Sequence, residues 1–249
     1  MATYVVSDLH GQYGVFREGL KKIGFGDNDS LYVLGDVIDR GDDGIKILQY
    51  IKRKKNIDLL LGNHEYMMLN SVDPDGGEEC CGEDAELWIL LNGGLKTYNK
   101  YMEMTRKSRK AMLTWLRNRY VIRTLEAGGR KFCLTHSYYI ENCEDKRYKF
   151  MRDDDVWQIV WKSVFREERG THGEDIYKYY DYTFITGHVP VQKVRNIYAP
   201  DEDFNILKMY KRGNLIDIDG GCAYGGNKMI DCGALFIRLD DMKAFPIAM

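Results

Sequence analysis

The amino-acid sequence predicts an α/β fold on two observations. Short runs of β-branched and aromatic residues, typical of strands, end abruptly at Asp, Gly, Asn or His, and helical segments separate the first of these runs. The strand-like runs occupy residues 3–6, 31–34, 57–61, 131–134, 182–186 and 215–218. Because open α/β sheets place their chemistry at the carboxyl ends of strands, we expect the polar clusters after these runs to converge.

The first three strands alternate with two predicted helices, at residues 13–23 and 44–52. In the second helix Ile45, Leu48 and Ile51 recur at three-residue steps, which gives the helix one apolar face. The chain is therefore expected to begin with a βαβαβ unit.

The middle of the chain has a different composition. Residues 73–83 are rich in Gly, Asp and Glu and predict a loop, whereas residues 83–91 and 106–119 have helical patterns. We interpret the stretch from about residue 73 to 120 as a helical insertion beside the site.

Length and composition limit the classes of protein that are compatible with the sequence. A chain of 249 residues, 44% of them hydrophobic, can bury one large core, so we expect a single domain over residues 1–249. The 36 Lys and Arg nearly balance the 38 Asp and Glu, which argues against nucleic acid or a membrane as partner. No apolar run approaches the roughly 20 residues of a membrane span. With no signal-peptide pattern either, we expect a cytoplasmic protein.

The histidines of the sequence predict a metal site, whereas the cysteines do not. The six cysteines form no CxxC pair, which argues against a zinc ribbon or a disulfide framework. Of the five histidines, four follow a predicted strand, and Asp and Asn occur at the same kind of position. One such histidine would usually be an ordinary polar residue, but this combination predicts a metal site. The residues concerned are Asp8, His10, Asp36, Asn63, His64, His136 and His188.

The ligand types indicate the chemistry of this site. Oxygen ligands combined with imidazoles suit manganese, iron or zinc, and one carboxylate can bridge two such ions. Asp36 would be this bridge. Two ions held in this way clamp phosphate oxygens and lower the pKa of a bound water, so that hydroxide forms at neutral pH. The pattern therefore predicts a hydrolase of phosphate esters.

Three sequence blocks resemble those of the calcineurin-like metallophosphoesterases and, within that family, the phosphoprotein phosphatase branch. They are DLHG at residues 8–11, GDVIDRG at 35–41 and GNHE at 62–65, followed by single histidines at 136 and 188. Residues 87–94 and 218–227 are similar to segments of the compact phage and bacterial serine/threonine phosphatases. The resemblance spans most of the chain and implies a four-layer αββα sandwich of two mixed sheets.

The resemblance also implies how the metal ligands are divided. Asp36 would contact both ions. The first ion would be held by Asp8, His10 and Asp36, and the second by Asp36, Asn63, His136 and His188. Two divalent ions are expected; manganese comes first, with iron or zinc as alternatives.

The resemblance assigns three further residues to the substrate. His64 would be the general acid that protonates the leaving oxygen, and Asp39 would orient His64 and raise its pKa. Arg40 would bind phosphate oxygens through its planar guanidinium, together with Asn63. Glu65 is expected to support a neighbouring group by a hydrogen bond or to begin a helix, without being a ligand.

The sequence departs from this family after the last of the predicted helices. The compact phosphatases carry a second phosphate-binding arginine in a Trp-x-Arg segment, and here Ser163 stands at that position. The candidates to supply the missing charge are Lys162, Arg166 and Arg152.

A second departure follows His136, where the chain has Tyr138 and Tyr139. We expect both tyrosines to take part in ordinary packing, with stacking of a substrate base as the alternative.

The leading functional prediction is a serine/threonine protein phosphatase that hydrolyses phosphomonoesters by in-line attack of a metal-bridging hydroxide. Its substrate would be a phosphoprotein or a small phosphoester. One alternative is a symmetrical bis(5'-nucleosyl)-tetraphosphatase, which would use the same metals. Another is a non-catalytic scaffold with the same fold, which the complete set of ligands, together with Asp39, Arg40 and His64, argues against.

Overall fold

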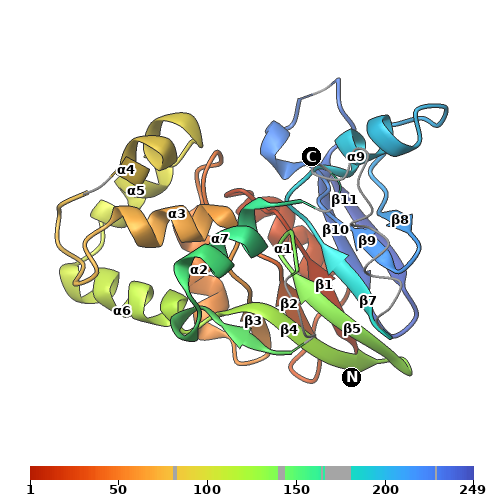
Figure 1. Ribbon diagram of the computed structural model, residues 1–249, viewed down its shortest axis with the longest axis horizontal. Coiled ribbons are helices and arrows are strands. Elements are labelled where there is room, and N and C mark those ends of the chain that lie inside the picture. The colour runs from red at the N-terminus through yellow and green to blue at the C-terminus, as the bar shows by residue number, and fades with distance from the viewer. Residues whose placement is uncertain (81–82, 140–143, 164, 166–180, 228) are drawn as a thin grey trace.

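The computed structural model describes residues 1–80, 83–139, 144–163, 165, 181–227 and 229–249 (Figure 1). Two mixed β-sheets form its centre, and helices surround them. Apolar side chains from both sheets belong to one continuous core.

The first sheet contains the βαβαβ unit that the sequence predicts. The three strands of this unit run parallel, because α1 (Tyr13–Lys22) and α2 (Gly44–Arg53) cross over between them. Two C-terminal strands extend the sheet: one pairs antiparallel with the first strand of the unit, and the other pairs antiparallel with that one. Phe16 of α1 stacks on Phe236 with 6.4 Å between the ring centroids. The strand order is β11 (Lys243–Ala248), β10 (Gly233–Arg238), β1 (Thr3–Val6), β2 (Ser30–Val33) and β3 (Ile57–Leu59).

The second sheet is also mixed. Its three central strands run parallel, and its outer strands pair antiparallel. An isolated bridge between Leu60 and Tyr120 connects the edge of the first sheet to this one. The strand order is β6 (Lys146–Arg147), β4 (Tyr120–Ala127), β5 (Arg130–Thr135), β7 (Thr183–Thr186), β9 (Leu215–Asp217) and β8 (Tyr210–Arg212).

The remaining helices lie at one end of the sheets and beside the second sheet (Figure 1). α7 contacts β4 and α3, and α9 contacts β8. The helices are α3 (Asn63–Ser71), α4 (Glu83–Glu86), a π-helical turn (Leu87–Leu91), α5 (Leu95–Met102), α6 (Arg106–Arg117), α7 (Asp153–Trp161) and α9 (Val191–Tyr198), with 3₁₀ turns at Tyr148–Phe150 and Cys222–Tyr224.

The architecture confirms the predicted fold class, an α/β sandwich of two mixed sheets. The predicted helix at residues 83–91 is divided into α4 and the π-helical turn, and α5 follows where no helix was predicted. The extent of the domain, the limits of the insertion and the cytoplasmic location stay predictions. Among the described residues, no helix combines the length and apolar character needed to cross a membrane.

Candidate dinuclear metal site

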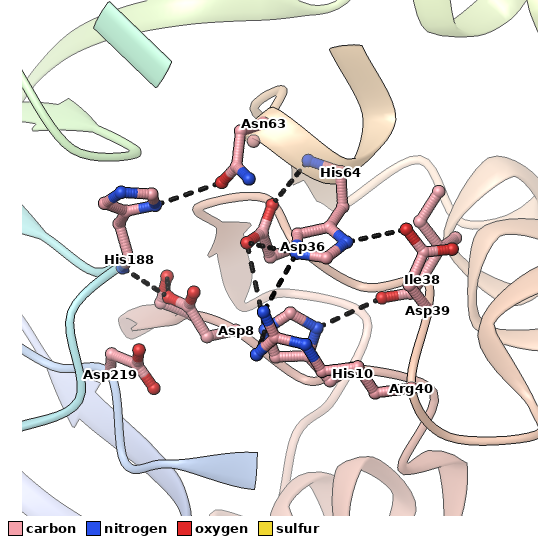
Figure 2. A network of polar contacts seen from close by, with 12 residues as sticks. Asp8, His10, Asp36, Ile38, Asp39, Arg40, Asn63, His64, His188 and Asp219 are labelled. Atoms are coloured by element: carbon pink, nitrogen blue, oxygen red, sulfur yellow. Dashed lines mark hydrogen bonds and ion pairs between the residues drawn. The ribbon is translucent and has the colours of Figure 1, made fainter. Parts of the chain in front are cut away.

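The polar clusters meet where strands of both sheets end (Figure 2). β1, β2 and β3 of the first sheet and β5 and β7 of the second each lead directly into one of them. The structure thus brings together every residue that the sequence proposed for the site. They are Asp8, His10, Asp36, Asp39, Arg40, Asn63, His64, His136 and His188. Most of them line a pocket of about 420 Å³.

The backbone of the site is strained. Seven non-glycine residues in the described part of the chain have a positive φ, and all but Met242 belong to the site. A left-handed conformation costs an L-residue roughly 1–2 kcal/mol. Such strain persists only where the surrounding structure enforces it, and it gathers at functional sites. The site residues concerned are Asp8, His10, Asp36, Asp39, Arg40 and His188, with φ between 41° and 74°.

Asp36 lies between histidines from both halves of the site. Its Oδ2 is 3.8 Å from Nε2 of His10 and 3.5 Å from Nε2 of His136. Its Oδ1 accepts a hydrogen bond from the backbone N–H of His64 at 3.0 Å, which fixes the carboxylate plane. Glu65 supports the same turn, because its carboxylate accepts the N–H groups of Asp36 and Val37. The role expected for Glu65, hydrogen-bonded support, is confirmed.

Two histidines are held in a defined tautomer. Nδ1 of His10 faces the carbonyl of Ile38 at 3.2 Å, and Nδ1 of His136 faces the carbonyl of Leu34 at 2.7 Å. Burial lowers the pKa of His10 well below its ordinary value and that of His136 to about 4, so both rings are neutral at pH 7. Each Nδ1 therefore carries the proton and donates it, and each Nε2 directs a lone pair into the site.

The side chains proposed to hold the second ion are arranged around Asn63. Its Oδ1 lies 3.0 Å from Nε2 of His136 and 3.0 Å from Nδ1 of His188. Because Nε2 of neutral His136 has no proton to donate, it and the amide oxygen are two acceptors that face each other. A cation between them removes this repulsion.

The other half of the site has a buried oxygen that suits a cation. Oδ2 of Asp8 accepts hydrogen bonds from the Ser7 hydroxyl and the His188 N–H, whereas its Oδ1 is buried and has no hydrogen-bond partner among the described residues. Burial and the neighbouring Asp219 raise the pKa of Asp8, and burial and Asp8 raise that of Asp36. Bound cations would offset this cost of gathering carboxylates.

Two groups of side chains have the spacing of metal ligands, and Asp36 belongs to both. One is His10, Asp36 and His64, and the other is Asp36, His136 and His188, with the ligand atoms of each within 4.8 Å of one another. The donor set and the shared carboxylate fit a pair of divalent cations. The first of these groups contains His64, whereas the ligand set expected from the sequence has Asp8 beside His10 and Asp36. The other contacts of His64 favour a different role.

His64 is hydrogen-bonded to Asp39. Its Nδ1 lies 2.6 Å from Oδ2 of Asp39, and its Nε2 lies 3.4 Å from Nη2 of Arg40. Burial raises the pKa of Asp39 to about 7. Burial and the Arg40 charge lower the pKa of His64 in the metal-free protein. The hydrogen bond to Asp39 is present, and the role expected for Asp39, to orient His64 and favour its protonated form, stays a prediction.

Comparison with known proteins decides the family. The sequence profile described as calcineurin-like phosphoesterase matches residues 1–216. The chain belongs to this family. It is therefore a hydrolase of a family that depends on divalent metals, and the predicted resemblance is confirmed.

Curated relatives of this calcineurin-like phosphoesterase act on two kinds of substrate. Serine/threonine-protein phosphatase 2 of Salmonella typhimurium is 28% identical over 195 residues, which cover 76% of this chain and 79% of that protein. A symmetrical bis(5'-nucleosyl)-tetraphosphatase of Buchnera aphidicola subsp. Schizaphis graminum is 29% identical over 143 residues, 55% of this chain and 44% of that protein. The match thus spans less than half of the tetraphosphatase.

Solved structures with the same fold include two phosphatases. A cold-active protein-tyrosine phosphatase of a Shewanella species superposes with a TM-score of 0.56 at 19% identity, over 98% of this chain and 80% of that one. A serine/threonine phosphatase of Saccharomyces cerevisiae gives a TM-score of 0.55 at 15% identity, over 95% and 72%. At these identities the likeness establishes the fold alone.

The phosphoesterase has no arginine at position 163, and the two suggested replacements that the structure describes, Lys162 and Arg152, form contacts outside the pocket lining. Ser163 is buried and accepts the N–H of Phe165 at 3.2 Å. The ammonium of Lys162 bonds to the side chain of Gln158, and Arg152 forms an exposed pair with Asp155. Arg166 lies outside the described residues. None of the described candidates lines the pocket.

Three pocket or supporting residues were not predicted from the sequence. Lys193 of α9 lines the pocket together with Arg40, although no local pattern marks it. Asp219 also lines the pocket, and burial raises its pKa to about 6. It follows the last predicted strand, so the strand-end pattern that indicated the proposed ligands could also have indicated Asp219. Trp88 donates its indole N–H to Oδ2 of Asp39 at 2.8 Å.

The two tyrosines after His136 do not form the pocket. Tyr139 is buried and packs against Phe184, with 5.3 Å between the ring centroids, and Tyr138 is partly buried against the core. Ordinary packing, the expected role, is confirmed. The aromatic rings that line the pocket are those of Trp161 and Tyr224.

Proposed function

We propose that this phosphoesterase hydrolyses phosphomonoesters of serine or threonine in proteins, with two divalent metal ions, manganese first among them. The observation that carries the proposal is the position of Asp36 between Nε2 of His10 and Nε2 of His136, at the floor of a pocket that also contains Arg40 and His64. In the proposal the first ion is held by Asp8, His10 and Asp36, and the second by Asp36, Asn63, His136 and His188. When bound, the two ions supply an activated water and positive charge beside the phosphate.

The chain's own residues then bind and orient the phosphate. The guanidinium of Arg40 lies in the pocket next to the imidazoles of His10 and His64, with 3.4 Å to each Nε2. Its planar fork suits two phosphate oxygens at once, and the amide of Asn63 faces the same space. Lys193 adds a second positive charge at the pocket wall, in place of the arginine that Ser163 replaces.

His64 is the general acid in this proposal. Its Nδ1 is occupied by Asp39, so its Nε2 is the atom that faces the pocket and can give a proton to the leaving serine or threonine oxygen as the P–O bond breaks. Burial lowers the pKa of His64 in the free protein. A phosphate dianion beside Arg40 raises that pKa again, so that the acid is protonated when substrate is present.

The similarity to the Salmonella phosphatase extends over most of both chains, which favours a phosphoprotein substrate. The rival is a symmetrical bis(5'-nucleosyl)-tetraphosphatase, for which the aromatic rings of Trp161 and Tyr224 at the pocket would stack a nucleotide base.

One assay separates these two substrates. Purified protein with added manganese is given a phosphoserine peptide and diadenosine tetraphosphate side by side, and kcat/KM is compared. We expect the phosphopeptide to be preferred. A much higher kcat/KM for the dinucleotide would overturn the phosphoprotein proposal and leave the metal site in place. Parallel reactions with zinc and iron(II) test the preference for manganese.

A further inference from the structure

Trp88 lies in the part of the chain that was interpreted as an insertion, yet it touches the proposed acid pair. Its indole N–H and Nδ1 of His64 both converge on Oδ2 of Asp39, at 2.8 Å and 2.6 Å. The other carboxylate oxygen, Oδ1, is buried and has no hydrogen-bond partner among the described residues. These two contacts therefore hold Oδ2 of Asp39 in place.

Further contacts from the same segment reach the residues beside it. The hydroxyl oxygen of Thr97 in α5 accepts the backbone N–H of Asp39 at 2.9 Å, and the carbonyl of Gly93 accepts the N–H of Arg40 at 3.1 Å. Both Asp39 and Arg40 have positive φ, a conformation that needs external support. Residues 88–97 thus brace the turn that carries the phosphate-binding arginine and the partner of the acid.

The local structure fixes the indole with little freedom. Trp88 is fully buried and contacts Tyr98 edge to face, with 6.3 Å between the ring centroids. Gly94 has ordinary helical dihedrals, φ −72° and ψ −14°, so its backbone does not require glycine. A Cβ at this position would lie 2.6 Å from Nε1 of Trp88. Gly94 therefore leaves the room that the indole N–H needs to reach Asp39.

We propose that Trp88 is a positioning residue of the reaction: through its hydrogen bond to Asp39 it aims the imidazole of His64 at the leaving oxygen. This inference rests on the proposed role of His64 as the acid. It also gives the helical segment after residue 83 a function, as the support of the acid pair.

The test uses two substrates that differ in their need for an acid. p-Nitrophenyl phosphate has a leaving group that departs without a proton, whereas the alkoxide of a phosphoserine peptide needs one. Trp88→Phe keeps an aromatic ring and removes the N–H donor, together with part of the buried ring volume. We expect it to lower kcat about tenfold on the phosphopeptide and less than about twofold on p-nitrophenyl phosphate, with KM nearly unchanged on both.

Two further variants keep the test decisive. Gly94→Ala should show the same dependence on the leaving group, and it carries the test if Trp88→Phe fails to fold. Tyr101→Phe is the control, because it removes a buried hydroxyl of α5 that has no hydrogen-bond partner among the described residues. We expect its kinetics to match those of the unmodified protein.

Two comparisons separate failure of this inference from failure of the proposed function. His64→Asn should lose activity selectively on the phosphopeptide. An equal loss on both substrates would refute the proposed role of His64 as the general acid, and with it this part of the proposed function. In an Asp39→Asn background, Trp88→Phe should add no further loss, because it acts through Asp39. Equal losses on both substrates for Trp88→Phe, or full additivity with Asp39→Asn, would overturn the positioning role alone.

Discussion

Asp36 differs from the other proposed ligands in that it would contact both metal ions, because its Oδ2 lies within 4 Å of histidines on both sides of the site. A neutral amide cannot supply the negative charge that a bridge between two cations needs. We therefore expect Asp36→Asn to weaken the binding of both ions together. Asp8→Asn, by contrast, should weaken one ion and leave the second near full occupancy.

The measurement is metal content after gel filtration, by plasma mass spectrometry, together with calorimetric titration of the metal-free proteins. Two ions retained tightly by the Asp36 variant would show that Asp36 is not the bridge. Loss of both ions in the Asp8 variant would show that the ligands are divided differently.

Lys193 allows a second prediction at the level of single residues. It lines the pocket with Arg40 but is exposed, so its attraction for a phosphate is screened by water. Lys193→Met removes the charge and preserves most of the side-chain length. We expect KM for a phosphopeptide to rise roughly three- to tenfold with kcat little changed, as for the loss of one partly solvated charge.

The matched control is Lys162→Met. Lys162 is next to Ser163 in sequence, but its ammonium bonds to Gln158 outside the pocket lining. Steady-state kinetics of both variants decide the question. If Lys162→Met raises KM and Lys193→Met does not, Lys162 supplies the positive charge of the missing arginine, and the role proposed for Lys193 is wrong.

At the scale of elements, the loops after β2 and β3 approach each other very closely. Gly35 has φ +90°, and a Cβ there would overlap the backbone of Gly62. Gly24 also has a positive φ, +62°, but a Cβ there would meet nothing within 4 Å. The two glycines therefore separate the effect of backbone conformation from that of contact between loops.

We expect Gly24→Ala to cost about 1–2 kcal/mol of unfolding free energy, from left-handed strain alone. Gly35→Ala should cost roughly 2–5 kcal/mol, since overpacking adds to the strain, and it should also lower metal affinity. Urea unfolding of both variants provides the comparison. Equal losses of stability would mean that the two loops can move apart without difficulty.

Elements were predictable where one periodicity dominated. The strands that end in polar clusters, and α2 with its apolar face, appeared where the pattern placed them. For α3 the sequence offered only a possible start at Glu65 and no extent, because the helix is buried on nearly all sides and so has no polar face to create a period. β10 was not assigned either, since its antiparallel partner β1 lies at the other end of the chain.

The residues of the site were likewise predictable where a local sequence pattern marks them, and not where tertiary packing alone brings them to the site. The proposed ligands at strand ends could be located from the sequence because each of them directly follows its strand. Trp88 and Lys193 could not, because Trp88 reaches Asp39 and Lys193 reaches the pocket only through tertiary packing. The lowering of the His64 pKa by burial could not be predicted either, since burial depends on the whole fold and the sequence shows only the nearby carboxylate.

At the scale of the molecule, the buried carboxyl groups should make the stability of the metal-free protein depend on pH. Burial raises the pKa of Asp39 to about 7, and those of Asp8, Asp36 and Asp217 well above 3.8. A carboxyl group whose pKa is raised by folding binds more protons in the folded state than in the unfolded state. Its contribution to stability is therefore lost as the pH rises through the raised value.

The buried histidines act in the opposite direction. Burial lowers their pKa below 6.5, so their contribution to stability increases with pH and is complete above that value. Of these buried carboxyl groups and histidines, the carboxyl groups are the ones that still titrate above pH 6.5. We expect the Tm of the protein in EDTA to fall between pH 6.5 and about 8.

Thermal unfolding in matched buffers checks this sign. With saturating manganese the trend should flatten or reverse, because ions bind the deprotonated carboxylates and stabilise the folded state. A Tm in EDTA that rises steadily over this range would contradict the assignment of raised pKa values to the carboxyl cluster.

The seven residues from Leu34 to Arg40 fix the spacing between several groups of the site. The carbonyls of Leu34 and Ile38 set the tautomers of two histidines, and the side chains of this stretch supply the proposed bridging carboxylate, the partner of His64 and the guanidinium proposed to bind phosphate. Inserting or deleting one residue here would misplace all of these at once. Substitutions at the rim of the pocket would leave this spacing unchanged, whereas a change in the length of the stretch would alter every one of these positions together.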